Sequence, residues 1–211
     1  MTGWGPWLTL ATLGAYHGVN PAMGWLFAVS RGLQERSGRA VALALPPIAL
    51  GHAVSVGATV ALLAAGSAVL SSSALRIGLA LLVSGFGLFK LIRPRHPRWV
   101  GMRLGFKDLT LWSFVMATAH GAGLMLLPVF LLAEGGAECS ACRAPELALT
   151  SWSGYLAAVS VHTLSMFVGA AAVAFVVYFK VGLALLRRAW FNLDVLWSLA
   201  LFGSGAAALL R

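Results

Sequence analysis

The sequence predicts an all-α, polytopic membrane protein with about six transmembrane helices. Of its 211 residues, 60% are hydrophobic and only 10% are charged, whereas charged residues make up about a quarter of an ordinary soluble domain. The apolar residues form long blocks with few charges, and each block is about as long as a helix that crosses roughly 30 Å of hydrocarbon. Together these observations favour one helical bundle in a lipid bilayer, without a separate soluble domain.

Six apolar blocks are expected to form the spans. They lie at residues 7–30, 41–65, 74–92, 109–133, 152–178 and 193–210. Before the first block, Trp4 and Trp7 are typical interfacial anchors, and no basic segment of a signal peptide precedes them, so we expect this helix to be retained. Pro21 removes a backbone hydrogen bond in the middle of the same block, as in discontinuous helices that line binding sites.

The segments between the blocks predict the orientation of the chain. The first, third and fifth connections hold 12 of the 15 Lys and Arg residues, and cytoplasmic loops carry such an excess. Both termini and the loop at 134–151 are then extracytoplasmic, in a multi-pass protein of the inner (plasma) membrane. The formal net charge of +9 thus comes mostly from Lys and Arg residues that orient the chain in the membrane and contact lipid of the cytoplasmic leaflet. We therefore expect no nucleic-acid partner.

The two halves of the chain, residues 1–100 and 101–211, carry matching motifs. Residues 15–18 (AYHG) match 118–121 (TAHG), and residues 51–55 (GHAVS) match 161–165 (VHTLS). Each half would be a repeat of three helices, and because three is odd, the second repeat enters the membrane in the opposite orientation. Such a 3+3 inverted repeat is typical of transporters. Chance similarity between short apolar segments is the alternative explanation.

Four of the five histidines fall near the middles of predicted spans, at one depth: His17, His52, His120 and His162. An imidazole in hydrocarbon needs partners for its ring nitrogens, so such residues are functional candidates. The alternative is that each ring ties neighbouring helices together through a hydrogen bond. Four histidines at one depth, two in each half, favour a shared site.

Polar neighbours extend this predicted site. Ser55 and Ser165 each follow a histidine by three residues, as Asn20 follows His17, so each shares a helix face with a histidine. The expected substrate-binding set is His17, Asn20, His52, Ser55, His120, His162 and Ser165, with the four histidines as candidate metal ligands. Met23, Met125 and Met166 are candidate soft ligands, although methionine in a membrane helix more often simply packs.

The ligand set leaves the substrate open. Imidazole and oxygen ligands suit nickel, cobalt, zinc or copper, and the same groups could hydrogen-bond a small polar solute or relay protons. No Asp or Glu lies inside a predicted span, because Asp108 and Asp194 stand at helix starts, where N-capping explains them. A divalent cation would therefore be poorly compensated in hydrocarbon, which keeps the polar solute as an alternative.

The segment His17-Gly18-Val19-Asn20-Pro21, matched by His120-Gly121, resembles the superfamily that joins lysine exporters, nickel/cobalt transporters and membrane thiol–disulfide carriers. The six-helix layout is similar as well. The resemblance implies transport through a site in the first helix of each half. Asn20 stands where the nickel/cobalt branch carries an acid. His17 and His120 stand where the thiol–disulfide branch carries cysteines, which argues against thiol relay.

The two cysteines, Cys139 and Cys142, lie in the external loop. One Cys-x-x-Cys pair is half of a structural zinc set, and the strand-and-helix context of a thioredoxin-like motif is missing. We expect a disulfide that braces the loop in an oxidising compartment, with weak capture of a metal ion as the alternative.

These observations predict a transporter or permease for a divalent transition-metal cation or a small polar solute, working by alternating access. One alternative is a haem- or metal-binding redox subunit, in which a single haem would use two histidines as axial ligands. Another is an accessory subunit of a larger membrane complex, and a homo-oligomer is equally open. An enzyme is not indicated, because no intramembrane carboxylate or cysteine accompanies the histidines.

Overall fold

The computed structural model describes residues 4–69, 72–92, 105–127, 129–130, 151–181, 198–199, 201–203 and 206. Every regular element in this part of the chain is a helix, and no strand occurs in it. The predicted all-α class is therefore confirmed. The external loop with Cys139 and Cys142, and most of the predicted span 193–210, lie outside the described residues.

Within the described ranges, six α-helices and three short helices of other types have defined bounds. They are α1 (Gly5–Val19), η1 (Pro21–Met23), α2 (Trp25–Glu35), α3 (Gly38–Val69), α4 (Ser72–Ile92), α5 (Phe106–His120), η2 (Gly123–Met125), α7 (Trp152–Val176) and η3 (Val177–Val181). The elements η1 and η2 are single 3₁₀ turns, and η3 is a π-turn that continues α7.

Two helices in the described residues are long and apolar enough to cross a membrane. They cover Gly38–Gly66 and Trp152–Lys180, each with 29 residues, and a shorter apolar helix covers Ile77–Ile92. The first and fourth predicted blocks differ from the prediction, because α1 and α5 end after 15 residues each. Both blocks are interrupted by a break in the helix, which begins after Val19 in the first block and after His120 in the fourth.

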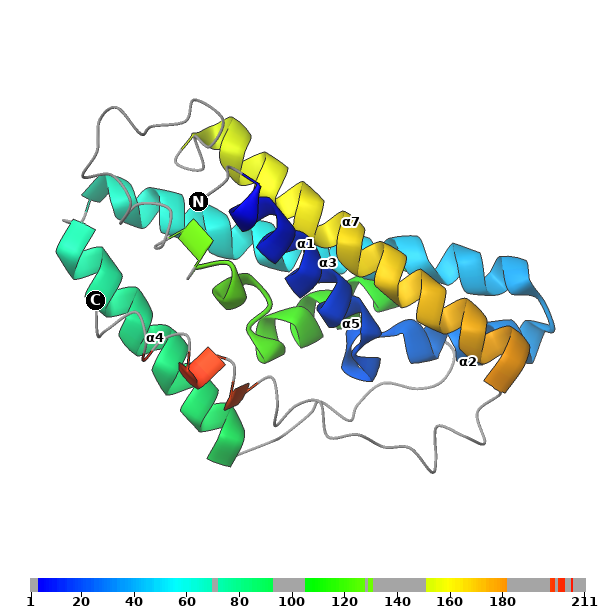
Figure 1. Cartoon of the computed structure of the whole chain (residues 1–211). Coiled ribbons are helices and arrows are strands. Elements are labelled where there is room, and N and C mark those ends of the chain that lie inside the picture. Colours follow the sequence, from blue (N-terminus) through cyan, green and yellow to red (C-terminus); the bar gives the residue numbers. More distant parts are fainter. Residues whose placement is uncertain are drawn as a thin grey trace.

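The helices associate as two close pairs (Figure 1). α1 lies along α7, and α3 lies along α5. Within each pair, residue numbers increase in the same direction along both helices. Leu10 of α1 contacts His162 of α7, and Gly18, further along α1, contacts Met166, further along α7. In the same way Ile48 and then Ser55 of α3 meet Ser113 and then Thr118 of α5. Each pair is therefore parallel, although its members are far apart in the sequence.

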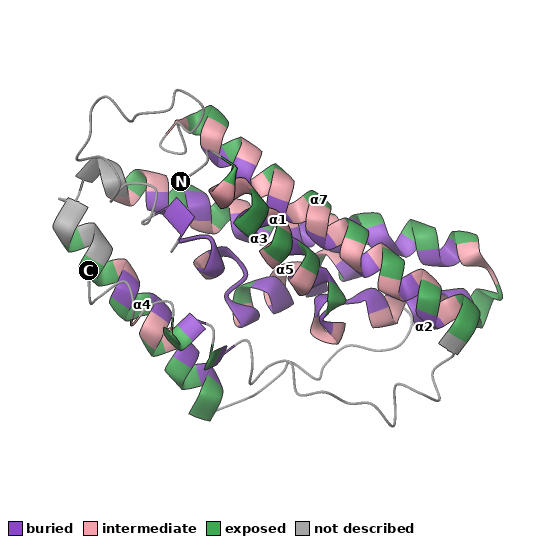
Figure 2. Ribbon diagram, viewed as in Figure 1, coloured by how far each residue is buried: buried purple, intermediate pink, exposed green. Residues whose placement is uncertain are grey.

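The core follows these pairs. One apolar cluster joins α1, α3, α5 and the segment after it to α4, and includes Leu10, Val60 and Leu126. A second cluster joins α2, α3 and α7 around Trp25, Ile48 and Met166. Figure 2 shows the buried faces of the helices turned toward one another, with exposed residues on their outer faces.

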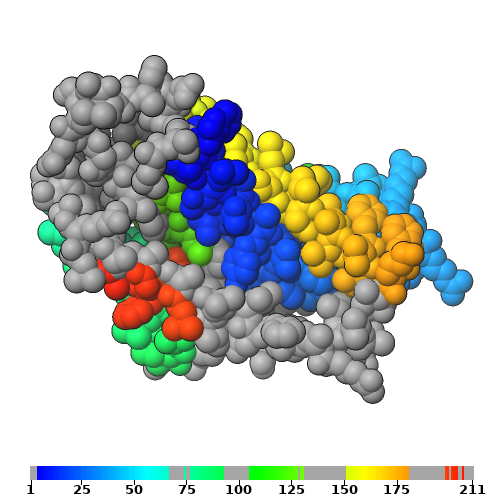
Figure 3. All heavy atoms as spheres, in the orientation of Figure 1, coloured from blue at the N-terminus to red at the C-terminus, as the bar shows by residue number. Residues whose placement is uncertain are grey.

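Those outer faces are apolar as well. Along α7, Leu156, Leu164 and Val168 are each more than 60% exposed, and Leu62 on α3 is 74% exposed. In the space-filling view, α1 and α7 form a continuous surface on the face that is seen (Figure 3). Large apolar side chains thus cover the outside of the helices as well as the core, which is unusual for a surface that faces water.

Candidate functional site

The chain leaves the helical path at Asn20, three residues after His17. Asn20 is extended (φ −65°, ψ 123°), and its side-chain Oδ1 accepts a hydrogen bond of 3.0 Å from the Ala22 N–H, which starts η1. Pro21 follows, where its missing N–H is tolerated at the first position of a helix. Gly24 then adopts φ 103°, which an L-residue avoids, and α2 begins. The local sequence therefore explains why the helix stops here and restarts.

Trp25 stabilises this break. Its side chain is only 2% exposed, and its indole Nε1 donates a 3.1 Å hydrogen bond to the carbonyl of Val19. That carbonyl belongs to the last turn of α1, where carbonyls have no partner within the helix. An aromatic side chain thus satisfies a backbone group that the break exposes.

A second break follows His120, the last residue of α5. Gly121 takes a left-handed conformation (φ 69°) and its N–H returns to the carbonyls of Ala117 and Thr118, which ends the helix. The single turn η2 comes next. His17 and His120 therefore both stand in the last turn of a helix, whereas the sequence predicted them near the middles of the spans 7–30 and 109–133.

The structure brings three of the four predicted histidines into mutual ring contact. The ring centroids of His17 and His52 are 5.1 Å apart, those of His52 and His162 are 5.4 Å apart, and those of His17 and His162 are 5.7 Å apart. Each residue is at most 2% exposed. We call His17, His52 and His162 the histidine cluster. It is built from α1, α3 and α7, so it joins the two halves of the chain.

The hydrogen bonds of the cluster are incomplete. The Nδ1 of His162 lies 3.3 Å from the carbonyl oxygen of Leu10, so Nδ1 carries the proton of this bond and Nε2 carries the lone pair. That Nε2 and both ring nitrogens of His52 are buried and have no hydrogen-bond partner within the described part of the chain. Buried polar atoms nearly always have partners, so these three nitrogens indicate a site for a ligand.

His120 lies at the edge of this group. It is 1% exposed, and its Nδ1 donates a 2.8 Å hydrogen bond to the carbonyl of Met116 in the preceding turn. His120 also lies within electrostatic range of His17. Like His162, it is held by a backbone carbonyl at Nδ1.

The three predicted polar neighbours occupy different places. Asn20 is buried, and its Oδ1 caps η1. Ser55 is buried one turn after His52, and its Oγ lies 2.9 Å from Oγ1 of Thr118, so it ties α3 to α5. Ser165 is half-buried and faces Gly14 of α1. Contact of these side chains with a substrate stays a prediction.

Glycines bring the helices close enough for the rings to meet. A Cβ at Gly14 would collide with the carbonyl oxygen of His162, and one at Gly18 with that of Met166. On α3, a Cβ at Gly51 would collide with the carbonyl of Thr110. Gly14 lies three residues before His17 and four before Gly18, and Gly51 directly precedes His52. Small residues spaced four apart are a sequence signal of closely packed membrane helices.

No group of three or more His, Cys, Asp and Glu side chains in the described residues could hold a metal ion in the arrangement that the structure shows. The rings of the cluster touch edge to face or stack, with interplanar angles of 62°, 71° and 17°. In this arrangement the three rings are therefore packed on one another.

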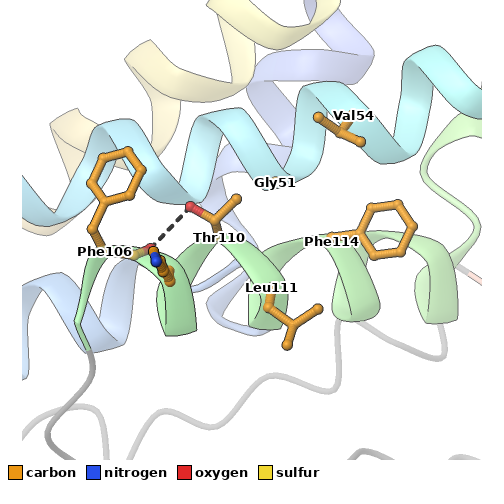
Figure 4. A pocket seen from close by; sticks show the side chains of 7 residues that line it. Gly51, Val54, Phe106, Thr110, Leu111 and Phe114 are labelled. Atoms are coloured by element: carbon orange, nitrogen blue, oxygen red, sulfur yellow. Dashed lines mark hydrogen bonds between the residues drawn. The ribbon is translucent and has the colours of Figure 1, made fainter.

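A separate shallow pocket of about 400 Å³ lies on the outer side of the α3–α5 pair (Figure 4). Its lining is almost entirely apolar and comprises Gly51, Val54, Phe106, Lys107, Thr110, Leu111 and Phe114. Thr110 directs its hydroxyl back to the carbonyl of Phe106, at 3.0 Å. Because this pocket is open and contains none of the predicted site residues, it is not the candidate site.

No protein-family model, no curated protein sequence and no solved structure matches this chain. The resemblance to the superfamily of lysine exporters and nickel/cobalt transporters therefore stays a prediction.

Proposed function

We propose that this chain is a membrane transporter whose substrate-binding site is the histidine cluster, with His120 beside it. The observation that carries the proposal is the set of buried ring nitrogens of His52 and His162 without partners in the described chain, beside His17 in the last turn of a broken helix. Broken helices next to buried polar groups are typical of transporter sites near the middle of the bilayer.

The outer surface of the helices supports placement in a membrane. In the apolar window of Trp152–Lys180 only 22% of the residues are buried, and in that of Gly38–Gly66 only 39% are. The core helix of a soluble protein would be mostly buried. Exposed Leu156, Leu164 and Val168 instead fit contact with lipid.

The parallel pairs support the 3+3 inverted repeat. In an inverted repeat, α1, α3 and α4 cross the membrane in alternating directions, and α5 starts the second repeat in the direction opposite to α1. It follows that α7 should be parallel to α1, and α5 should be parallel to α3. The contacts between the helices agree with both expectations. The first helix of each half then packs on the second helix of the other half, as a pseudo-two-fold axis requires.

Basic residues support the proposed orientation. Arg36 and Arg39 flank the turn between α2 and α3, and Lys180 is in η3. These two segments meet, because Gly38 faces the ring of Phe179. Positive charge therefore collects at one end of the bundle, which we assign to the cytoplasm of a cell with this protein in its inner membrane.

A substrate in the cluster would contact imidazoles from both halves of the chain. Movement of α1 with α7 relative to α3 with α5 would open the cluster first to one side and then to the other, as in alternating access. A transition-metal cation and a small polar solute both suit such a site, because neutral imidazole offers one donor and one acceptor or ligand nitrogen.

The geometry gives less support to a haem subunit. Axial imidazoles lie on opposite faces of the porphyrin, with the macrocycle between them. The three rings of the cluster are instead packed directly against one another, at centroid distances of at most 5.7 Å. A Soret band in the purified protein would contradict the transporter proposal in favour of haem.

The test uses the purified chain in proteoliposomes. Uptake of nickel, cobalt, zinc and copper is measured by elemental analysis, and uptake of labelled small polar solutes in parallel. We expect His17→Ala and His120→Ala to abolish the transport that the unmodified protein shows, while both variants remain folded in detergent. His96→Ala, at the histidine outside the predicted spans, is the control. Unchanged transport in both His17→Ala and His120→Ala would contradict the proposal.

A further inference from the structure

We propose that the histidine cluster binds a single monovalent transition-metal cation, copper(I), through one ring nitrogen each of His17, His52 and His162. This inference rests on the proposed function, because it names the substrate of the same site. It is drawn from the spacing of the three rings, the nitrogens left open on two of them, and the lack of acidic side chains around them.

The spacing of the rings fits one metal ion. Three imidazoles that bind a metal at about 2.0 Å place their ring centroids roughly 5 to 5.5 Å apart, in trigonal or tetrahedral geometry. The centroids in the cluster are 5.1, 5.4 and 5.7 Å apart. To converge on one point the nitrogens need rotation of the rings, and rotation about χ2 of histidine is broad and soft. The backbone therefore already supplies the required separation.

Two of the rings have nitrogens ready to coordinate. The bond from Nδ1 of His162 to the carbonyl of Leu10 leaves the lone pair on Nε2, which has no other partner in the described chain. A backbone carbonyl that fixes one ring nitrogen while the other binds metal is the usual arrangement around metal-binding histidines. Both nitrogens of His52 are open, so its ring can present either one.

The charge around the cluster selects a monovalent ion. The acidic residues in the described part of the chain are Glu35 and Asp108. Glu35 pairs with Arg31 at an exposed end of α2, and Asp108 accepts a hydrogen bond from the backbone N–H of Gly105 at the start of α5. The Born cost of removing an ion from water rises with the square of its charge. Neutral imidazoles therefore accommodate one positive charge far better than two.

The helix breaks supply a matching negative potential. His17 and His120 lie in the last turns of α1 and α5, and a helix C-terminus carries roughly half of an elementary negative charge. Two such ends compensate about one positive charge. In transporters, the C-terminal ends of half-helices are used in this way to hold cations.

Methionines that stand close in the sequence to the two breaks and to His162 favour copper(I) among monovalent ions. Met23 and Met125 end the single turns η1 and η2 that follow the two breaks, and Met166 is buried one turn after His162. Thioether sulfur selects copper(I), and imidazole binds copper readily. Alkali cations prefer oxygen ligands, which the cluster does not present.

The experiment measures copper(I) binding to the full chain in detergent, under anaerobic reducing conditions, by competition with a chromophoric copper(I) chelator. Because thiols bind copper(I), every protein carries Cys139→Ser and Cys142→Ser. We expect one copper(I) per chain, and zinc and nickel bound at least on the order of 100-fold more weakly. His52→Ala and His162→Ala should weaken copper(I) binding by a similar factor, and the control His96→Ala should not.

Loss of folding is separated from loss of ligand by His52→Gln, which keeps a polar side chain of similar size. A variant that elutes as a single species and keeps its helical circular dichroism, yet loses copper(I), supports the inference. X-ray absorption of the bound copper should show three nitrogen neighbours. Equal or tighter binding of zinc, or copper(I) binding that survives in both His52→Ala and His162→Ala, would overturn the inference.

The two proposals fail in different ways. If His17→Ala abolishes transport but the protein binds no copper(I), the transporter proposal stands and the copper inference is wrong. If copper(I) binds at the three histidines but no substrate crosses the proteoliposome membrane, the site assignment is right and the transporter proposal is wrong.

Discussion

At the scale of single residues, Trp25 and Asn20 shape the break that puts His17 in the cluster. Asn20 caps η1 with its side chain, and the indole of Trp25 satisfies the carbonyl of Val19. Neither contact is visible as a pattern in the sequence, because each depends on where the chain turns after the break. Both residues therefore act on the site by positioning the backbone beside it.

Trp25→Phe tests this role. The substitution keeps an aromatic ring but removes the only donor of the indole, and the loss of such a hydrogen bond costs about 0.5–1.5 kcal/mol. We expect a lower melting temperature in detergent. The exposed Trp4, at 72% exposure, provides the control Trp4→Phe, which should leave the melting temperature unchanged. Equal melting temperatures for the two variants would contradict the assigned role of Trp25.

The residue scale also shows how much of the site the sequence could predict. The motif match identified His17, His52 and His162, and the structure brings these three together. It also assigned Ser55 to the face of His52, but the hydroxyl of Ser55 meets Thr118 of another helix. Spacing along one helix gives the shared face, whereas the neighbour across that face depends on how the helices pack.

At the scale of elements, the α1–α7 pair depends on small residues. Gly14 and Gly18 place the backbone of α1 directly on that of α7, at the level of His162 and Met166. Small residues are the usual way to bring membrane helices this close. The distance between the rings of His17 and His162 is therefore set by residues that have no side chain.

Gly18→Ala should disrupt this pair. The added Cβ would meet the carbonyl oxygen of Met166, and we expect a loss of stability of about 1–3 kcal/mol from overpacking, seen as a lower melting temperature. Gly57→Ala is the matched control, because a Cβ at Gly57 of α3 meets nothing within 4 Å. In a helix interior the control should gain up to about 1 kcal/mol. A stable Gly18→Ala variant would show that the two helices are not in such close contact.

Helix boundaries were predictable only in part. The sequence predicted helices over 41–65 and 152–178, and the structure covers the first with α3 and the second with α7 and η3. It predicted one span over 7–30, where the structure has α1, η1 and α2. Pro21 indicated that the helix is interrupted, but the length of the interruption depends on Gly24, which adopts a left-handed conformation before the next helix begins. A glycine permits that conformation without requiring it.

At the scale of the whole molecule, the proposed orientation joins the charge pattern to the parallel pairs. The ends of α2 and η3 with their basic residues should face the cytoplasm, and the start of α7 should face the opposite side. This arrangement can be tested without knowledge of the substrate.

Single cysteines in a background with Cys139→Ser and Cys142→Ser are labelled in intact cells with a maleimide that does not cross membranes. We expect Arg39→Cys and Lys180→Cys to react only after the cells are opened, because cytoplasmic loops hold the positive charge. Ser153→Cys, at the exposed start of α7, should react in intact cells. Labelling of Arg39→Cys and Ser153→Cys from the same side would rule out the inverted repeat.

The pairing of α1 with α7 has a consequence for biosynthesis. His17 leaves the ribosome early, while its partner His162 lies near the end of the described chain. At about 5–20 residues per second, the first helix waits roughly 10 to 30 s for α7. During this time the polar end of α1 has to be shielded by the translocation machinery, by an insertion chaperone, or by a temporary partner helix. Slowed translation before residue 152 should therefore increase degradation of the nascent protein.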